Sequence, residues 1–318
     1  MKVGIFTSST PIGAISPNRA QRAIEFLKSK GHEIVLGEMF YQNDFYRTGT
    51  ILERANEINE LAKEKIDLLL SSIGGNNTSS ILPYLNYELI NQNVKTVCGF
   101  SDSTALLSAI INKCPDVEVF YGPALFPNFG EFEQDSREIS YNSLFNYPHQ
   151  ISYEDFIYDS EENWEHYEQS RQLKSLVWKS KNINKDTTLI SGVVKGGNLS
   201  TLSGIWGSEY APIFNQGDIL FIEDEDKNIA TMERLFNLLK LNKTFDHLNA
   251  IILGTHKNFD DQKTGKQPID VLLEVLNGQN IPILYDVNIS HDKPMLAIRL
   301  NSLITIDFVQ NKIINKWI

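Results

Sequence analysis

The sequence Val97-Cys98-Gly99-Phe100-Ser101-Asp102-Ser103-Thr104-Ala105-Leu106-Leu107 joins a short apolar run to a corner of small residues and then to an amphipathic helix. A strand that turns sharply into a helix exposes the side chain at the corner, and the first helical N–H groups point toward it. Ser101 stands at that corner, with Gly99 and Ser103 two residues away on either side. The pattern favours a nucleophile, although Ser, Asp, Ser and Thr in a row are also typical of an ordinary helix N-cap.

Short apolar runs alternate with longer segments of 3.6-residue period on both sides of this corner, between Val3 and Tyr121. Such alternation indicates strands and helices in turn, and hence a mainly parallel, doubly wound sheet. Ser16-Pro17 and Gly31 mark the ends of a first helix, and a second spans about residues 50–65. We expect strands at Val3–Thr7, Glu33–Leu36, Ile66–Ser72, Thr96–Gly99 and Val117–Tyr121.

The chain resumes this pattern after residue 187 and ends less regularly. The tail Met295–Phe308 alternates as antiparallel strands do, and Asn311-Lys312 could turn it back on itself. This predicts a second α/β domain of mixed topology that includes antiparallel strands. Besides a strand ending at Gly192, we expect strands at Ile219–Glu223, Ala250–Gly254 and Pro282–Asp286, and helices at about Ile229–Leu241 and Pro268–Leu276.

The region between Asn128 and Lys185 is rich in aromatic and acidic residues and has no clean period. We interpret it as a linker that carries a lid or binding surface, because aromatic rings offer flat contact area to a ligand ring. Core packing under a long loop fits the same residues equally well. The predicted organisation is a nucleophile domain (residues 1–148), an aromatic linker or lid (149–186) and a C-terminal domain (187–318).

The amino-acid composition limits the classes of molecule to which this protein is expected to bind. A chain of 318 residues is long enough for about two domains with real cores. The formal net charge of -11 argues against nucleic acid or an anionic membrane surface as the main partner. Two cysteines, Cys98 and Cys114, are too few for a disulfide scaffold. The N-terminus reads as a first strand rather than a signal peptide, and no apolar run reaches the length of a membrane span. We therefore expect a cytoplasmic protein that acts on small molecules or neutral peptides.

Two further segments complement the serine corner. Ile73-Gly74-Gly75-Asn76-Asn77-Thr78-Ser79 follows a strand, and its glycines let the backbone approach a ligand and bind an anion, unless the segment is a plain turn. A serine hydroxyl also needs a base and a group that orients the base. His291 lies in a polar loop after the strand Pro282–Asp286, where open α/β sheets place their sites. A surface role for a lone loop histidine is the alternative.

Glu223 ends an apolar run and opens the acidic series Glu223-Asp224-Glu225-Asp226. Because it continues the strand, it can be held against the core, as an orienting carboxylate requires. A divalent metal would take carboxylate oxygens too, but the series lacks the spacing of a calcium loop and the chain lacks a Walker motif. A zinc site of His247 and His256 fits no ligand pattern. We expect neither metal nor cofactor.

Together these segments resemble the serine-peptidase family that contains the LD-carboxypeptidases and the microcin C immunity proteins, over nearly the whole chain. The chain departs from the family pattern at Ser290, where glycine is usual, and at Arg299-Leu300-Asn301, where a Pro-Gly pair is usual. The stretches that carry the resemblance are 54–59 (RANEIN), 72–78 (SIGGNNT), 81–86 (ILPYLN), 99–106 (GFSDSTAL), 121–123 (YGP), 195–199 (KGGNL) with Leu202, 218–224 (DILFIED) and His291.

The resemblance implies a triad of Ser101 as nucleophile, Glu223 as orienting acid and His291 as base, the same three residues that position alone selects. It also implies an oxyanion hole made by the backbone N–H groups of Gly75 and Asp102, which are donors of the kind a tetrahedral intermediate needs. A homodimer is the oligomeric state that the family implies.

Within the family, the sequence Ser-Ile-Gly-Gly-Asn-Asn and the long aromatic linker are more similar to those of the microcin C immunity branch. In that branch, tryptophans of the linker stack on the nucleobase of the substrate. The resemblance makes Trp164 and Trp178 candidates for that contact, and we add Asn76 and Asn198 as candidates for further substrate contacts.

The activity implied by the resemblance is hydrolysis of an amide bond in peptidyl- or aminoacyl-nucleotide conjugates, as in microcin C detoxification. The first alternative is an LD-carboxypeptidase that acts on cell-wall muropeptides, because the two branches share the triad and differ in the pocket. The second is a ligand-binding protein without catalysis, against which the intact set of Ser, Glu and His argues.

Overall fold

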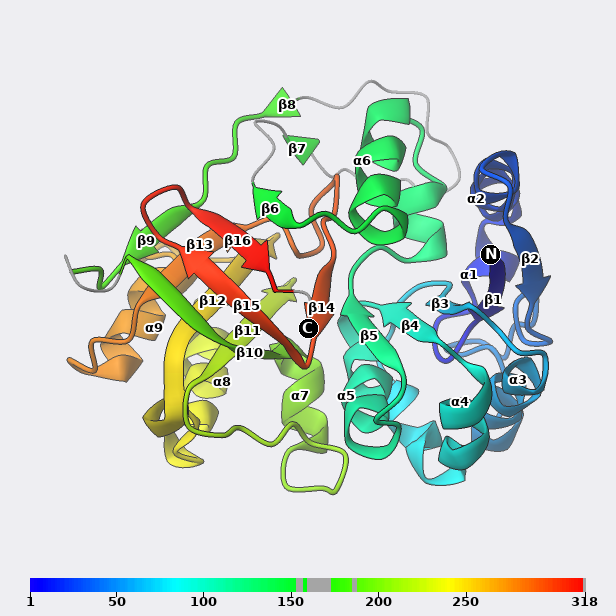
Figure 1. Ribbon diagram of the computed structural model, residues 1–318, viewed down its shortest axis with the longest axis horizontal. Coiled ribbons are helices and arrows are strands. Elements are labelled where there is room, and N and C mark those ends of the chain that lie inside the picture. Colours follow the sequence, from blue (N-terminus) through cyan, green and yellow to red (C-terminus); the bar gives the residue numbers. More distant parts are fainter. Residues whose placement is uncertain (153–156, 159–172, 185–187, 317–318) are drawn as a thin grey trace.

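Two sheets lie side by side, with helices packed against them (Figure 1). The computed structural model describes residues 1–152, 157–158, 173–184 and 188–316. Among the helices of these residues, none has the length and apolar character needed to cross a membrane. The predicted α/β class, with a mainly parallel first sheet and a mixed second sheet, is confirmed.

The first sheet has the strand order β14-β5-β4-β3-β1-β2, in which all pairs are parallel except β14 with β5. Its strands are β1 (Lys2–Phe6), β2 (Glu33–Leu36), β3 (Leu68–Ser71), β4 (Thr96–Gly99), β5 (Glu118–Tyr121) and β14 (Ile298–Leu300). The helices between these parallel strands are α1 (Ile12–Ile15), α2 (Pro17–Ser29), α3 (Ile51–Lys63), α4 (Tyr87–Asn93) and α5 (Thr104–Lys113). Local signals explain their starts: Pro17 opens α2, and Thr50 forms a capping box with Glu53 at α3.

The second sheet has the order β6-β16-β15-β10-β11-β12-β13-β9, with β10 to β13 parallel and the outer strands antiparallel. Its strands are β6 (Gln150–Ser152), β9 (Lys179–Lys181), β10 (Leu189–Asn198), β11 (Asp218–Glu225), β12 (Leu248–Lys257), β13 (Ile283–Val287), β15 (Ser302–Asp307) and β16 (Lys312–Asn315). Its helices are α7 (Leu199–Ile205), α8 (Ile229–Leu241) and α9 (Pro268–Leu276). The predicted reversal at Asn311-Lys312 is the turn between β15 and β16. A separate two-stranded ladder joins β7 (Ile157–Tyr158) to β8 (Leu173–Lys174).

Three strands pair with strands that lie on the other side of a predicted domain boundary. β6 and β9 come from the region we interpreted as a linker, yet they form the two edges of the second sheet. β14 comes from the C-terminal tail and completes the first sheet beside β5 (Figure 1). The region without a clean period also contains a helix that the sequence analysis missed, α6 (Gln134–Phe145). Boundaries at residues 148 and 186 therefore do not separate the two sheets.

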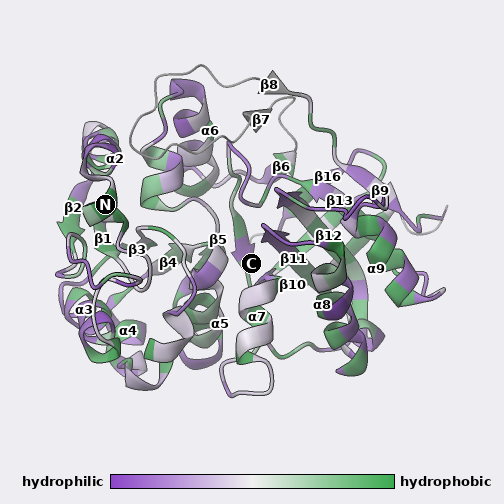
Figure 2. Cartoon of the chain, turned by 180° about the vertical axis from the view of Figure 1, so that it is seen from behind, coloured by the Kyte–Doolittle hydropathy of each residue, from purple (hydrophilic) through white to green (hydrophobic). Residues whose placement is uncertain are grey.

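One apolar core connects the two sheets. It includes Leu106 on α5, Tyr121 on β5, Phe221 on β11 and Ile252 on β12, all of them fully buried. Helices such as α3 and α9 carry both hydrophobic and hydrophilic residues, as expected when one face meets the core and the other meets water (Figure 2). The continuous core holds the ends of β4, β11 and β13 in fixed relative positions, and the site lies there.

Candidate active site

Ser101 lies in η2 (Ser101–Ser103), the short 3₁₀ turn between β4 and α5. Its backbone is left-handed, with φ of +54°, a conformation that is rare for residues other than glycine and that concentrates at functional sites. Residues 73–79, which we call the glycine loop, pack closely against it, because a Cβ on Gly74 would lie 2.7 Å from the Cβ of Ser101. Ser101 lines a cavity of about 630 Å³ together with His291, Gly75 and Asp102.

The polar residues after Ser101 do not cap the helix, since neither η2 nor α5 has a side-chain cap hydrogen bond. The carboxylate of Asp102 instead accepts hydrogen bonds from the N–H and hydroxyl of Thr78 on the glycine loop. The hydroxyl of Ser103 pairs with a serine of β3, and that of Thr104 accepts from the N–H of Asn198 at the end of β10. The N-cap alternative is therefore not supported, and the corner is tied to three separate elements.

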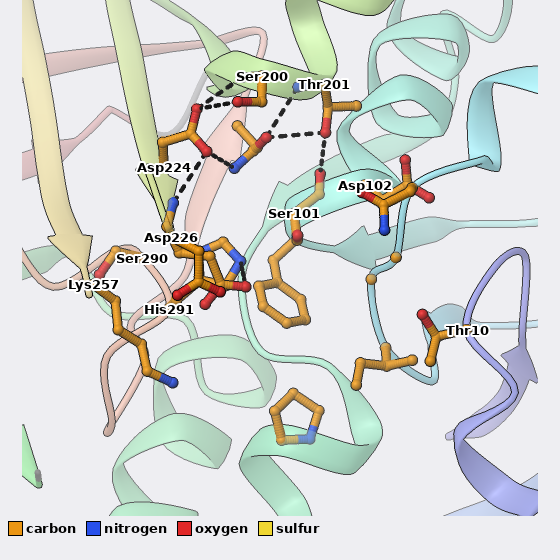
Figure 3. A pocket seen from close by; sticks show the side chains of 18 of the residues that line it. Thr10, Ser101, Asp102, Ser200, Thr201, Asp224, Asp226, Lys257, Ser290 and His291 are labelled. Atoms are coloured by element: carbon orange, nitrogen blue, oxygen red, sulfur yellow. Dashed lines mark hydrogen bonds and ion pairs between the residues drawn. The ribbon is translucent and has the colours of Figure 1, made fainter. Parts of the chain in front are cut away.

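Glu223 and His291 meet at the carboxyl ends of β11 and β13. The carboxylate of Glu223 is fully buried, and its Oε2 lies 2.6 Å from Nδ1 of His291. The imidazole packs against the ring of Phe100, with 4.9 Å between centroids. Ser101 and His291 line one pocket (Figure 3). The structure thus brings together the three residues that the sequence selected.

Tyr121 connects the acid to the nucleophile, a role that the sequence analysis missed. Its hydroxyl donates to Oε1 of Glu223 at 2.6 Å and accepts from the backbone N–H of Ser101 at 3.0 Å. The side-chain amide of Asn198 donates to the same Oε1 at 2.9 Å. A tyrosine at the end of a buried strand gives no local signal that separates this role from core packing.

The charges around this pair are mutually stabilising. Burial alone would raise the pKa of Glu223, but the charge and hydrogen bonds from His291 and Tyr121 outweigh it and hold that pKa below its usual value. Burial alone would lower the pKa of His291, but the carboxylates of Glu223 and Glu225 raise it to about 9. Glu223 is therefore ionised at neutral pH, as an orienting acid must be.

Replacing Tyr121 by phenylalanine is expected to lower both stability and kcat. The change leaves the Ser101 N–H without its acceptor and Glu223 with one donor fewer, which costs about 1–3 kcal/mol in the free energy of unfolding. Because the nucleophile and the acid lose their common brace, kcat should also fall, by up to about 100-fold. Denaturant unfolding and steady-state kinetics measure the two effects.

Tyr147 provides a matched control, because its hydroxyl forms the same kind of bridge away from the triad. It accepts from the N–H of Arg299 and donates to the amide oxygen of Asn315. Tyr147→Phe should lower stability without lowering kcat. Equal losses of kcat in both variants would show that Tyr121 acts through global stability alone.

The predicted oxyanion donors line the cavity beside Ser101. Gly75 has φ of +151°, and a Cβ there would lie 2.1 Å from the hydroxyl of Ser9, so only glycine fits. That hydroxyl accepts from the N–H groups of Asn76 and Asn77, which fixes the loop. Within the described part of the chain, the N–H groups of Gly75 and Asp102 donate no hydrogen bond. Both are therefore available to an incoming oxyanion.

The other predicted contacts fall in different places. Asn76 is exposed and lines the cavity. Asn198 also lines it, but its side chain is occupied, because it donates to Glu223 and Asp224 and caps α7. Its side-chain amide therefore braces Glu223, and a contact of Asn198 with substrate stays a prediction. Trp164 lies outside the described residues.

Trp178 is fully buried and does not line the cavity. Its indole N–H donates at 3.0 Å to the side-chain oxygen of Asn288, and the backbone of Asn288 accepts from Leu296 across the loop that carries His291. The structure therefore gives Trp178 a supporting role under residues 288–294, which we call the histidine loop, with no free face for a nucleobase. Core packing, the alternative left open for these aromatic residues, applies here.

The departure from the family pattern before His291 is accommodated locally. Ser290 is fully buried, and its hydroxyl hydrogen-bonds to that of Thr255 on β12. At Asn301 the backbone is left-handed, with φ of +52°, which asparagine tolerates better than most residues. Serine at position 290 and asparagine at position 301 therefore fit the local structure in place of the residues that are usual in the family.

The acidic series divides among separate partners. Asp224 accepts from the N–H and hydroxyl of Ser200, whereas Glu225 lies 3.1 Å from Nε2 of His291. Among the described residues, no three His, Cys, Asp or Glu side chains gather as a metal site would require. The contact between Glu225 and His291 was not predicted from the sequence. The spacing gave a signal for it, because residues two positions apart on a strand, such as Glu223 and Glu225, point to the same face of the sheet.

Comparisons with known proteins identify the family of this chain. Residues 3–122 match the LD-carboxypeptidase N-terminal domain, and residues 191–306 match the LD-carboxypeptidase C-terminal domain. The microcin C7 self-immunity protein MccF of Escherichia coli is 43% identical over 313 residues, which cover 96% of this chain and 90% of that protein. A putative carboxypeptidase of Vibrio cholerae is 38% identical over 329 residues, covering 100% of this chain and 96% of that protein.

A solved structure of MccF in complex with aspartyl sulfamoyl adenosine superposes with a TM-score of 0.93 at 42% identity. The match covers 99% of this chain and 96% of that one. Two matched domains and relatives of this identity over nearly the full length confirm the resemblance that the sequence suggested. The protein belongs to the LD-carboxypeptidase family and is a serine carboxypeptidase-like hydrolase.

Proposed function

We propose that this enzyme hydrolyses an amide bond in peptidyl- or aminoacyl-nucleotide conjugates and so detoxifies compounds of the microcin C type. One observation carries the proposal: over nearly its whole length the chain is similar to an immunity protein whose solved structure contains aspartyl sulfamoyl adenosine. The arrangement of Ser101, Glu223 and His291 supplies the chemistry that such a reaction needs.

In the proposed mechanism, Nε2 of His291 takes the proton of Ser101 as its Oγ attacks the amide carbonyl. The N–H groups of Gly75 and Asp102 hold the oxyanion of the tetrahedral intermediate. His291 then gives the proton to the leaving nitrogen, and water attacks the acyl-enzyme with His291 again as base. Glu223 stays ionised throughout and holds the imidazole by its Nδ1.

The cavity offers charges of both signs around the nucleophile. Lys227, Lys257 and Lys293 line it, as do Glu225 and Asp226. An aminoacyl-nucleotide also carries both signs, a cationic amino group on the acyl part and an anionic phosphate in the linkage. Such a substrate would therefore find groups of complementary charge in the lining of the cavity.

An LD-carboxypeptidase that acts on cell-wall peptides is the second candidate. The two matched domains carry that description, and the relative from Vibrio cholerae is named a putative carboxypeptidase. A non-catalytic ligand-binding protein fits less well, because a protein without chemistry would have no need for a strained serine beside a Glu-His pair.

A side-by-side hydrolysis assay tests the proposal, with an aminoacyl-sulfamoyl adenosine and an LD-tetrapeptide as the two substrates. We expect kcat/KM to be higher for the adenosine conjugate, with no hydrolysis of either substrate by Ser101→Ala enzyme prepared in the same way. Preferential cleavage of the tetrapeptide would favour the cell-wall activity. No cleavage of either compound would favour a ligand-binding role.

We also infer that the enzyme works in the cytoplasm as a homodimer. Support for the compartment comes from Cys98 and Cys114, which are both free and buried, as in proteins kept in a reducing environment. Support for the dimer comes from the family resemblance alone. Light scattering coupled to size-exclusion chromatography measures the mass in solution, and a mass of one chain would reject the dimer.

A further inference from the structure

The imidazole of His291 lies between two carboxylates, not one. Its Nδ1 is 2.6 Å from Oε2 of Glu223, the usual orienting contact of a triad. Its Nε2 is 3.1 Å from Oε1 of Glu225, which lines the cavity and stands two residues later on β11. Nε2 is the atom that has to receive the proton of Ser101, so Glu225 occupies the side of the ring where the chemistry takes place.

The contact with Glu225 is one of charge without hydrogen-bond geometry. Within the described residues, Nε2 of His291 is buried and has no hydrogen-bond partner. The Oγ of Ser101 likewise makes no hydrogen bond to any described residue. Base and nucleophile are therefore not yet engaged, and the nearest anion to Nε2 is a carboxylate that can only stabilise the protonated ring.

Other charged groups do not cancel this effect. Lys257 on β12 opposes the imidazolium, and Tyr121 on β5 faces Glu223. Asp292 and Lys293 belong to the histidine loop itself, and Lys293 is paired with the buried Glu131 at 3.5 Å. The two carboxylates of β11 outweigh the lysine and raise the pKa of His291 to about 9.

We propose that Glu225 is a second positioning carboxylate for His291, which holds the imidazolium in the resting enzyme and has to release it before Ser101 can be deprotonated. This inference rests on the serine mechanism proposed above, and it adds to that mechanism a residue outside the triad. Glu225 contacts neither Ser101 nor the leaving group in this scheme, and its effect on the pH dependence is exerted through the histidine.

The pH dependence follows from the sign of the charge. Burial raises the pKa of Glu225, although the charges of His291 and Lys257 oppose this, so its own charge is present only above that pKa. An ionised Glu225 favours the protonated ring, which cannot accept a proton, so the fraction of active enzyme rises with pH toward the pKa of His291. Without that charge the ring loses its proton at lower pH. The acid limb of kcat/KM should then move to lower pH, and activity at neutral pH should rise.

Glu225→Gln tests the proposal, because it removes the charge and keeps the length of the side chain. We expect the acid limb of kcat/KM to move down by about 1–3 pH units, the range produced by one opposite charge at this distance. Near pH 7 this raises kcat/KM by about 10-fold for the first unit of the shift and by about 100-fold at most, since the ring is then almost wholly neutral. At pH values above both limbs, the rates of variant and wild type should converge.

Asp226→Asn is the matched control. It removes the same charge from the next residue, whose side chain accepts from Asn258 and does not contact His291. The pH of its acid limb should stay with that of the wild type, while the plateau of kcat/KM is free to change because Asp226 lines the cavity. A limb that moves equally in both variants would show a general effect of net charge and would overturn the proposal.

A titration of the His291 ring by NMR separates this inference from the proposed function, because it needs no substrate. The resonance is assigned by its absence from His291→Gln, and Glu225→Ala serves as a second charge-free variant. A pKa of His291 that is unchanged in the Glu225 variants overturns the inference. A lowered pKa in an enzyme that does not cleave nucleotide conjugates supports the inference and rejects the proposed substrate.

Discussion

Ser101→Ala is expected to abolish hydrolysis and to leave the fold intact. The substitution removes the attacking oxygen, and loss of a triad member typically lowers kcat by about 10⁴-fold or more. Stability should hardly change, because within the described residues the Ser101 hydroxyl has no hydrogen-bond partner that the change would leave unpaired. Alanine also keeps the Cβ and so adds no strain at φ of +54°. Product release and thermal unfolding of the purified variant measure the two effects.

Ser103→Ala is the matched control for this result. Ser103 lies on the same corner and is fully buried, and its hydroxyl pairs with that of Ser71. Its removal should cost stability, because it leaves the partner hydroxyl unpaired, but kcat should stay within about 10-fold of wild type. Near wild-type activity in Ser101→Ala would exclude Ser101 as the nucleophile.

His291→Ala should have an effect of similar size. His291 is a buried imidazole with one nitrogen on the carboxylate of Glu223 and the other at the cavity. Without it no group accepts the Ser101 proton. In a serine protease where each residue has been replaced separately, loss of the base lowers kcat by about as much as loss of the nucleophile. The measurement is kcat over a range of pH, since hydroxide in solution replaces the base only in part.

His256 is the nearest rival, two residues beyond the glycine that faces Glu223. Its Nδ1 contacts the carbonyl of Gly254, its ring packs against Phe236, and it does not line the cavity. Burial lowers the pKa of His256, so the ring is neutral at pH 7. His256→Ala should reduce stability and keep kcat per folded molecule. The reverse pair of results would mean that His256 is the base and that the serine mechanism runs through a different loop.

The sequence predicted best those helices that have both a regular spacing of apolar residues and a capping residue or proline at the start. The helices Ile229–Leu241 and Pro268–Leu276 have the expected bounds, since Asn228 caps the first and proline opens the second. The helix Gln134–Phe145 was missed, because its buried residues include three serines and only one large apolar side chain. A period in hydrophobicity is weak where small polar residues fill the buried face.

The sequence predicted where strands lie better than it predicted which strands pair with each other. The alternation of Met295–Phe308 indicated antiparallel strands, yet β14 pairs in one sheet and β15 in the other. Partners in a sheet are chosen by packing between distant segments, and the pattern of one strand does not name its neighbour. The edge strands β6 and β9 were hidden for the same reason inside a region that looked like a linker.

By itself, the sequence determined the strand-to-helix corner at Ser101, the carboxylate at the end of one buried strand and the histidine loop at the end of another. These are local features, set by backbone propensity and by where an apolar run stops. Only the tertiary structure decided that Tyr121 braces Ser101 against Glu223 and that Glu225 faces the free nitrogen of His291. The contact between Tyr121 and Glu223 joins residues 102 positions apart. Alternation along a strand tells which side chains share a face, but what they meet there depends on how the two sheets pack.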